Sequence, residues 1–206
     1  MNIVVIADGL TQNDFNEKGI EEGVLLKLVT TIEDAHDADV FFYLLHESTI
    51  ESNRKALGDL PNMVIVNAVE TTLDHLPANA VRINGWPGFI NAGALEIAVS
   101  EANKDAVSTV LKALGWEFNF VPDIPGMVTP RTIAMIVNEA YFALGDKVST
   151  KEEIDIAMKL GTSYPYGPFE WSEKIGLKKI LSLLQKLEAT DERYAPAPLL
   201  VQESKL

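Results

Sequence analysis

Residues 164–171 read YPYGPFEW and separate two amphipathic segments near the C-terminal end of the chain. Proline cannot continue a helix and glycine allows close backbone approach, so this stretch predicts a helix end, a tight corner filled by its aromatic rings, and a new helix start. The helix before it is predicted from a capping box of Thr150 and Glu153, and we expect Gly161 to end it. The helix after it is predicted from the amphipathic run KKILSLLQKL, and a proline-rich tail, YAPAPLL, follows.

The segment upstream of this corner also predicts a helix. We expect Thr129 to be its N-cap and Pro130 to lie in its first turn. Apolar residues then recur at helical spacing over about four turns. They are Ile133, Ile136, Val137, Ala140, Tyr141 and Leu144. This stripe, with its neighbours, carries enough apolar surface to predict a subunit contact.

The first half of the chain follows a different pattern. Short apolar runs that are rich in β-branched or aromatic residues predict strands at 2–8, 39–45, 63–69, 80–84 and 116–123. Helical spacing predicts helices at 49–60 and at 103–115, the second ending at Gly115. The alternation predicts a mostly parallel sheet with helices packed on it. We therefore expect an α/β domain over residues 1–121 and an all-α domain over residues 122–206.

Composition excludes several classes of function. A formal net charge of -13 and a pI near 4.6 repel polyanions, so nucleic acid and anionic membranes are not expected partners. The chain has no cysteine, and no apolar run approaches the roughly 20 residues that span a bilayer, so we expect a cytoplasmic protein. His36, His46 and His75 are widely spaced and lack a metal-binding frame, so no metal site is predicted.

Residues 122–201 resemble, as one unit, the C-terminal domain of the 3-hydroxyacyl-CoA dehydrogenase family. Three stretches carry the resemblance: PDIPGMVTPRTIAMIVNEAYFAL, STKEEIDIAMKLGTSYPYGPFEW and DERYAPAPLL. It implies a helical domain that commonly forms the homodimer contact and follows a Rossmann-like domain. It also implies a role in fatty acid and acyl-CoA metabolism, with NAD-linked oxidation of 3-hydroxyacyl-CoA as the family reaction.

The first half resembles the later part of that Rossmann-like domain more faintly, in HDADVFFYLLHES, VNAVETTL and RINGWPGFINAGALEIAV. The resemblance implies a cofactor-side role for Glu47 and catalytic-site positions for Thr71 and Thr72. It places Glu96 on the glutamate that orients the catalytic histidine, and retains Arg131 as a substrate-side residue. Strand-end hydroxyls that cap backbone groups remain an alternative interpretation of the two threonines.

The family's chemical groups are missing at the matching positions. Gly9 is the only glycine before Gly19 in the first turn, so the GxGxxG pattern is absent and standard NAD binding is not expected. The segment that normally carries the second strand is shortened. The catalytic histidine falls on Asn84 or Ile83, and Pro130 occupies the position of an asparagine. We therefore expect little or no dehydrogenase activity.

Three hypotheses remain open at this stage. The chain is a diverged family member without turnover; or an acyl-CoA-binding or regulatory dimeric scaffold that pairs with an active paralogue; or an active dehydrogenase whose cofactor site is rebuilt from a loop at 9–19. Separately, His75, four residues after Thr71, is a candidate substitute for the lost base. A pocket onto which Thr71, Glu96 and Arg131 converge would favour ligand binding. Filling by Trp86, Phe89 and Trp171 would favour a scaffold.

Overall fold

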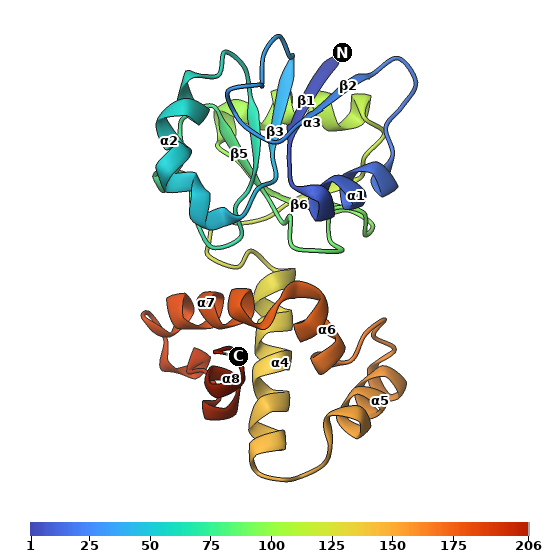
Figure 1. The fold of residues 1–206 in the computed structure, drawn as a ribbon, viewed down its shortest axis with the longest axis vertical. Coiled ribbons are helices and arrows are strands. Elements are labelled where there is room, and N and C mark those ends of the chain that lie inside the picture. Colours follow the sequence, from blue (N-terminus) through green and yellow to red (C-terminus); the bar gives the residue numbers. More distant parts are fainter. Residues whose placement is uncertain (206) are drawn as a thin grey trace. The chain divides into compact units, whose positions relative to one another are not determined.

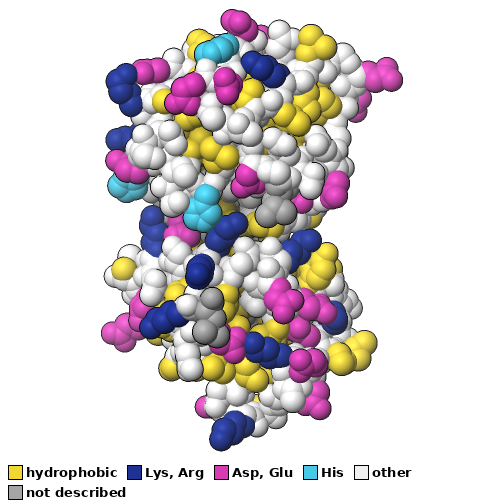
Figure 2. Space-filling model, viewed as in Figure 1, with side chains coloured by type: hydrophobic (Ala, Val, Ile, Leu, Met, Phe, Trp, Pro, Cys, Tyr) yellow, Lys and Arg dark blue, Asp and Glu magenta, His cyan; other side chains and the backbone are white. Residues whose placement is uncertain are grey.

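The computed structural model describes residues 1–205, apart from the side chain of Leu10. The chain divides into two compact units, Met1–Met127 and Val128–Leu206. The division lies C-terminal to the predicted boundary at 121/122 because the segment after the last strand is bound to the sheet. Asp123 pairs with Arg82, and the Gly126 amide donates to the Val69 carbonyl over 2.8 Å. Acidic side chains are scattered over the surface of both units (Figure 2).

The first unit is built on one seven-stranded sheet with the order β2-β1-β3-β4-β5-β6-β7. Neighbouring strands are parallel except β5 and β6, which are antiparallel. The strands are β1 (Asn2–Ile6), β2 (Leu25–Val29), β3 (Val40–Tyr43), β4 (Val64–Asn67), β5 (Ala80–Ile83), β6 (Leu95–Ala98) and β7 (Phe118–Phe120). The predicted parallel-dominated sheet is confirmed, and every predicted strand is present in shortened form.

Helices cover both faces of this sheet (Figure 1). They are α1 (Gly9–Lys18), α2 (Ile50–Asp59) and α3 (Lys104–Ala113), with 3-10 turns at Glu47–Thr49, Leu73–His75 and Glu101–Asn103. Helices α1 and α3 pack on one face, where the rings of Phe15, Phe42 and Trp116 meet edge to face at 5.1–5.6 Å. Helix α2 packs on the other face.

Sequence patterns missed α1, β2 and β6. Residues 9–18 form a helix, so the loop predicted at 9–19 is wrong. Helix α1 has no strong apolar stripe, and Phe15 supplies its buried anchor. A doubly wound fold of the standard kind has the strand order 3-2-1-4-5-6. Here only β2 lies outside β1, so the first half of that pattern lacks one outer strand, in line with the predicted contraction.

The second unit is helical, as predicted. Its elements are α4 (Thr129–Gly145), α5 (Lys151–Thr162), α6 (Pro168–Ile175), α7 (Leu177–Glu188), a 3-10 turn at Glu192–Tyr194 and α8 (Pro198–Glu203). The capping box of Thr150 and Glu153 is confirmed. Three details were wrong. Thr129 lies inside α4 with Val128 as N-cap, α5 runs through Gly161 to end at left-handed Ser163, and the proline-rich tail contains α8.

The YPYGPFEW corner is held by a buried carboxylate. Asp155 on α5 accepts hydrogen bonds from the amides of Phe169 (2.8 Å) and Glu170 (3.2 Å) at the start of α6. A Cβ on Gly167 would lie 2.3 Å from the Asp155 carboxylate, so only glycine fits there. The aromatic prediction was half right. Phe169 and Trp171 are buried, whereas the Tyr164 and Tyr166 rings are exposed.

Candidate functional site

The N-terminus of α1 is capped by the chain's own carboxylate. Asp8 follows β1, and its Oδ1 accepts from the Thr11 amide (3.0 Å) and the Thr11 hydroxyl (2.9 Å). In dinucleotide-binding folds this helix end leaves its amides to the pyrophosphate, and glycines keep side chains away. Here the negatively charged carboxylate of Asp8 is bound at the N-terminus of α1.

The rest of the turn also departs from a dinucleotide site. In the six-residue window Ala7–Gln12 the one glycine is Gly9, and the Gln12 side chain donates back to the Ala7 carbonyl over 3.2 Å. Strand β2 is followed by Thr30 and Thr31, where a ribose-binding fold carries an acid. Phosphate-side and ribose-side features of the standard site are therefore both absent from this turn and strand end.

The sheet shows which of the two candidate residues lies opposite Glu96. The antiparallel register pairs Ile83 with Ile97, so the next residue, Asn84, lies opposite Glu96, and the Asn84 amide donates to the Glu96 carbonyl over 3.2 Å. Asn84 is 2% exposed, and its side-chain oxygen accepts from the Trp86 amide over 3.3 Å. A carboxamide does not take up a proton at neutral pH, so the residue beside Glu96 cannot be a general base.

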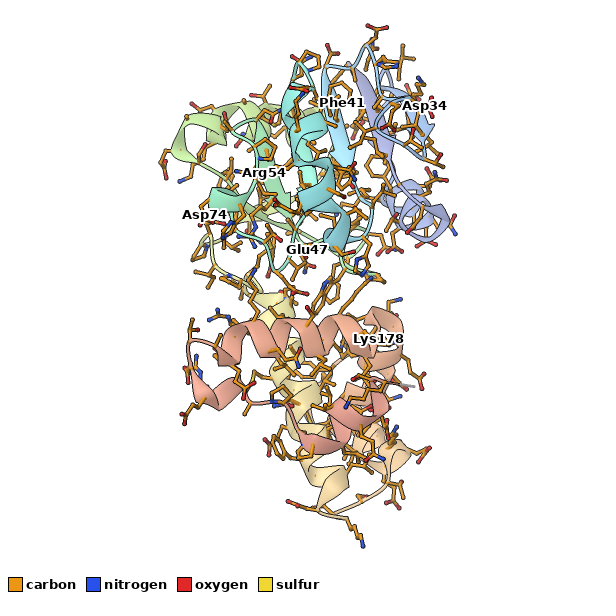
Figure 3. The ribbon with its side chains drawn as sticks, turned by 60° about the vertical axis from the view of Figure 1, so that its left-hand side comes forward. Asp34, Phe41, Glu47, Arg54, Asp74 and Lys178 are labelled. Carbon is orange, nitrogen blue, oxygen red and sulfur yellow. The ribbon has the colours of Figure 1, made fainter. Side chains whose placement is uncertain are left out.

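The Glu47 carboxylate has a structural role. Its carboxylate accepts from the amides of Val69 (2.9 Å), Glu70 (2.9 Å) and Thr71 (2.5 Å), and so closes the loop after β4. Figure 3 shows Glu47 at the start of α2, at the same edge of the sheet as Asp74. Two of the predicted site residues, Glu47 and Thr71, are thus brought together. The contact joins the Glu47 carboxylate to the backbone amide of Thr71 and does not involve the Thr71 hydroxyl.

The Thr72 hydroxyl is bonded to the Asp74 carboxylate, and this hydrogen bond holds the pKa of Asp74 below its usual range. His75 follows in the same 3-10 turn, with an exposed side chain 3.5 Å from Asp74. The hydroxyl of Thr72 therefore binds a side chain of its own turn and makes no side-chain cap to the backbone of that turn.

Sequence reasoning missed a buried arginine at this edge. The Arg82 side chain, fully buried, donates to the carbonyls of Ala68 and Val69 (both 3.0 Å) and pairs with Asp123. Burial lowers the pKa of Arg82, and the bond with Asp123 opposes that effect. A charged residue inside the apolar run AVRIN was the available signal, because a buried guanidinium needs several acceptors.

Arg131 lies near the start of α4. Its guanidinium is 5.4 Å from the centre of the Tyr194 ring, and Arg193 lies 4.6 Å from the same ring. The three side chains line a cavity of about 470 Å³ together with Met135 and Ile136. Within residues 1–205 no cluster of three metal-ligating side chains occurs, and no helix is long and apolar enough to cross a bilayer.

A family model described as the C-terminal domain of 3-hydroxyacyl-CoA dehydrogenase matches residues 126–205, which is essentially the helical unit. The helical unit is therefore similar to the C-terminal domain of the 3-hydroxyacyl-CoA dehydrogenase family. That family is NAD-dependent. The family's helical domain is present in this chain with the expected order of elements, and the N-terminal sheet is Rossmann-like, as in that family.

Curated relatives match about half of the chain. A 3-hydroxyadipyl-CoA dehydrogenase of Escherichia coli K12 is 40% identical over 116 residues, which cover 53% of this chain and 24% of the relative. A 3-hydroxybutyryl-CoA dehydrogenase of Bradyrhizobium diazoefficiens is 37% identical over 108 residues, covering 52% and 37%. The chain thus spans well under half the length of these relatives.

Solved structures extend the likeness of fold to the whole chain. The (S)-3-hydroxybutyryl-CoA dehydrogenase of Ralstonia eutropha aligns with 98% of this chain and 92% of its own, at a TM-score of 0.74 and 19% identity. The 3-hydroxybutyryl-CoA dehydrogenase of Escherichia coli K12 is 32% identical over 71% of this chain and 32% of its own, at a TM-score of 0.60. The first of these likenesses concerns the fold alone.

Proposed function

We propose that this chain is a diverged member of the 3-hydroxyacyl-CoA dehydrogenase family that has lost NAD-linked turnover and acts in acyl-CoA metabolism as a dimeric scaffold. The observation that carries the proposal is the position of Asn84, directly opposite Glu96. Oxidation of a secondary alcohol requires a base for the hydroxyl proton, and a positioned histidine contributes on the order of 10² to 10⁴ in rate. Asparagine supplies none of this.

Two further features support the loss of turnover. A pyrophosphate brought to the start of α1 would meet the Asp8 carboxylate, which is already bonded to the Thr11 amide. Like charges at that helix end oppose dinucleotide binding. In addition, Pro130 lies in the first turn of α4, where the family carries an asparagine, and proline has neither a side-chain nor a backbone donor.

The scaffold role is supported by apolar surface on the helical unit. Phe142, Val148, Ile156 and Leu160 are 39–82% exposed on and between α4 and α5. The same two helices border a groove of about 250 Å³ with Ala140, Ala143, Ile154 and Met158 in its lining. Exposed apolar side chains of this kind are typical of an interface, and we assign them to a second copy of this chain.

Acyl-CoA binding without turnover is the second candidate. The cavity beside Tyr194 combines two guanidinium groups with the apolar side chains of Met135 and Ile136; Glu139 also lines it, and Arg193 pairs with Asp191 over 3.0 Å. Such a lining suits an anionic ligand with an apolar arm, as in an acyl thioester that carries phosphates.

The decisive experiment mixes the protein with acetoacetyl-CoA and NADH and follows the absorbance of NADH. We expect no turnover, and calorimetry with NADH alone should show no binding. Turnover by the native chain that Glu96→Gln abolishes would refute the proposal. Binding of acetoacetyl-CoA that Arg131→Ala removes would replace the scaffold by the second candidate.

Dimerisation is tested separately by light scattering, where the 22.6 kDa chain should have twice its mass. Leu160→Lys places a charge in the apolar surface and should give monomers. Gln185→Lys adds the same charge at an exposed position of α7 and should leave the dimer intact. If the two variants have equal masses in light scattering, Leu160 on α5 does not lie in the interface.

A further inference from the structure

Strand β2 forms an open edge of the sheet with leucines on its surface. It pairs with β1 on one side and has no strand on the other. Leu25 is 69% exposed and Leu28 is 39% exposed, and hydrophobic side chains reach the surface around β2 (Figure 2). Long, apolar, open edges are rare in monomeric proteins because they invite pairing with another strand.

The missing outer strand explains this exposure. In the standard doubly wound order a further strand lies outside the second one and covers its edge. This sheet lacks that strand, so the backbone groups on the outer side of β2 have no neighbour in the sheet. Leu25 donates to the Met1 carbonyl and Val29 accepts from the Ala7 amide, so alternate residues face β1. The residues that direct their N–H and C=O groups outward are therefore Leu26 and Leu28.

The sequence of β2 is self-complementary in one antiparallel register. With Leu26 opposite its own copy, Val24 faces Leu28 of the second chain, so one face carries an unbroken apolar ladder. On the other face Leu25 lies opposite Lys27, whose methylene stem would cover the leucine, while its ammonium donates to the Asp34 carbonyl over 2.8 Å.

Charge selects this register over its neighbour. Centring the pair on Lys27 would place two lysines opposite each other, which is destabilising. When the pair is centred on Leu26, the two lysines are not opposite each other. Glu22, which precedes the strand, then lies opposite Thr30 of the other chain. No like charges then face one another along the strand.

We propose that the outer edge of β2 is a self-association surface, on which a second copy of this chain adds its own β2 in antiparallel orientation about Leu26. The pairing joins two seven-stranded sheets into one continuous sheet around a two-fold axis. This surface lies on the α/β unit and is independent of the helical surface assigned above. A five-residue edge buries less than the roughly 1,000 Å² of stable interfaces, so the contact forms with increasing protein concentration.

The register is tested by cysteine cross-linking, for which the native chain offers a cysteine-free background. Leu25→Cys and Lys27→Cys are made separately, and each is oxidised alone and in an equal mixture. Directly opposite residues of this kind have Cα atoms about 4.5 Å apart, within disulfide range. Each residue and its own copy are offset by two positions, about 7 Å along the strand, which lies outside that range.

We expect a cross-linked heterodimer in the mixture and at least a tenfold lower yield from either variant alone. Cross-linking of Lys27→Cys with itself would overturn the proposed register. Absence of cross-linking in all three samples, at concentrations where light scattering detects association, would place self-association elsewhere and overturn the proposal. Monomers at every concentration would also overturn it.

A proline variant tests the backbone pairing. Leu28→Pro removes an N–H that points away from β1, so the sheet should keep its far-UV circular dichroism. The cysteine mixture should lose its cross-link in this background, whereas Leu28→Val, which keeps the N–H, should retain it. Equal cross-linking in both backgrounds would show that β2 backbones do not pair.

Discussion

Helices α6 and α1 each have a carboxylate that accepts a hydrogen bond from a backbone amide at the start of the helix, but the surroundings of the two carboxylates differ. At the start of α6, Asp155 is buried and bonded to two amides, and Gly167 has no room for a side chain. At the start of α1, Asp8 is exposed, and a Cβ added at Gly9 would have no atom within 4 Å. The first end is enclosed by packing and the second faces outward.

The difference shows where sequence is constrained by the fold itself. The enclosed end of α6 keeps the family's YPxGPFE pattern, and substitution of its buried residues Gly167, Pro168 and Phe169 would disturb packing. The open end of α1 has no such constraint once a phosphate no longer has to fit. There Asp8 accepts from the Thr11 amide, a helix-end donor that a bound phosphate would otherwise satisfy.

The largest expected effect comes from breaking the enclosed end with Gly167→Ala. The new methyl group would lie 2.3–2.4 Å from the Asp155 side chain, so the corner must open, and we expect a loss of about 3 kcal/mol in the free energy of unfolding. Urea unfolding followed by circular dichroism measures it. Gly161→Ala is the control, because it lies within α5 with open space around it and should stabilise by about 0.5–1 kcal/mol.

Asp155→Ala should have the next largest effect, about 2 kcal/mol in the free energy of unfolding, because it leaves the amides of Phe169 and Glu170 without acceptors. The same unfolding measurement detects it. Combined with Gly167→Ala, the loss should be well below the sum of the two, since both changes act on one contact. Full additivity would contradict the coupling between these residues.

Asp8→Ala should cost only about 1 kcal/mol, the usual value for an exposed N-cap. Asp8→Asn keeps an acceptor oxygen for the Thr11 amide and should unfold at nearly the native urea concentration. If both variants lose the same stability, the negative charge and not the hydrogen bond is what stabilises α1.

The smallest effect concerns pH at the enclosed end. The hydrogen bond from Lys159 has the largest effect on the pKa of Glu170, and the hydrogen bond from the Gly167 amide adds to it. Together they hold this pKa below its ordinary 4.5. A lowered folded-state pKa stabilises the protein above the unfolded value, and the stabilisation disappears as pH falls through the folded value. The difference in unfolding midpoint between the native chain and Glu170→Gln should therefore be present at pH 7 and vanish towards pH 3. A difference that persists at pH 3 would assign the effect to lost packing.

Local signals predicted most of the helices. The capping box of Thr150 and Glu153 and the left-handed Gly115 after α3 are short-range features, and both are confirmed. Strand β6 was not predicted, and helix α1 and strand β2 were missed because their patterns are weak. Helix α1 is anchored by Phe15, and β2 is an edge strand with exposed leucines, so neither shows the periodicity that marks a buried face.

Long-range contacts decided the rest of the candidate site. The sequence left Ile83 and Asn84 as alternatives for the histidine position, and only the register of β5 with β6 places Asn84 beside Glu96. Glu47 was expected on the cofactor side, but its carboxylate binds backbone amides more than twenty residues away in the chain. No local pattern encodes either pairing.

Arg82 has a practical consequence for dissecting the molecule. Its guanidinium reaches acceptors in two segments, the loop after β4 and the residues around Asp123, which lies 41 residues away. A truncated α/β unit that stopped at residue 121 would bury this cation with half of its acceptors missing, at a cost of several kcal/mol. Expression of that unit by itself therefore requires a chain that continues through Gly126, whose amide fastens the same segment to Val69.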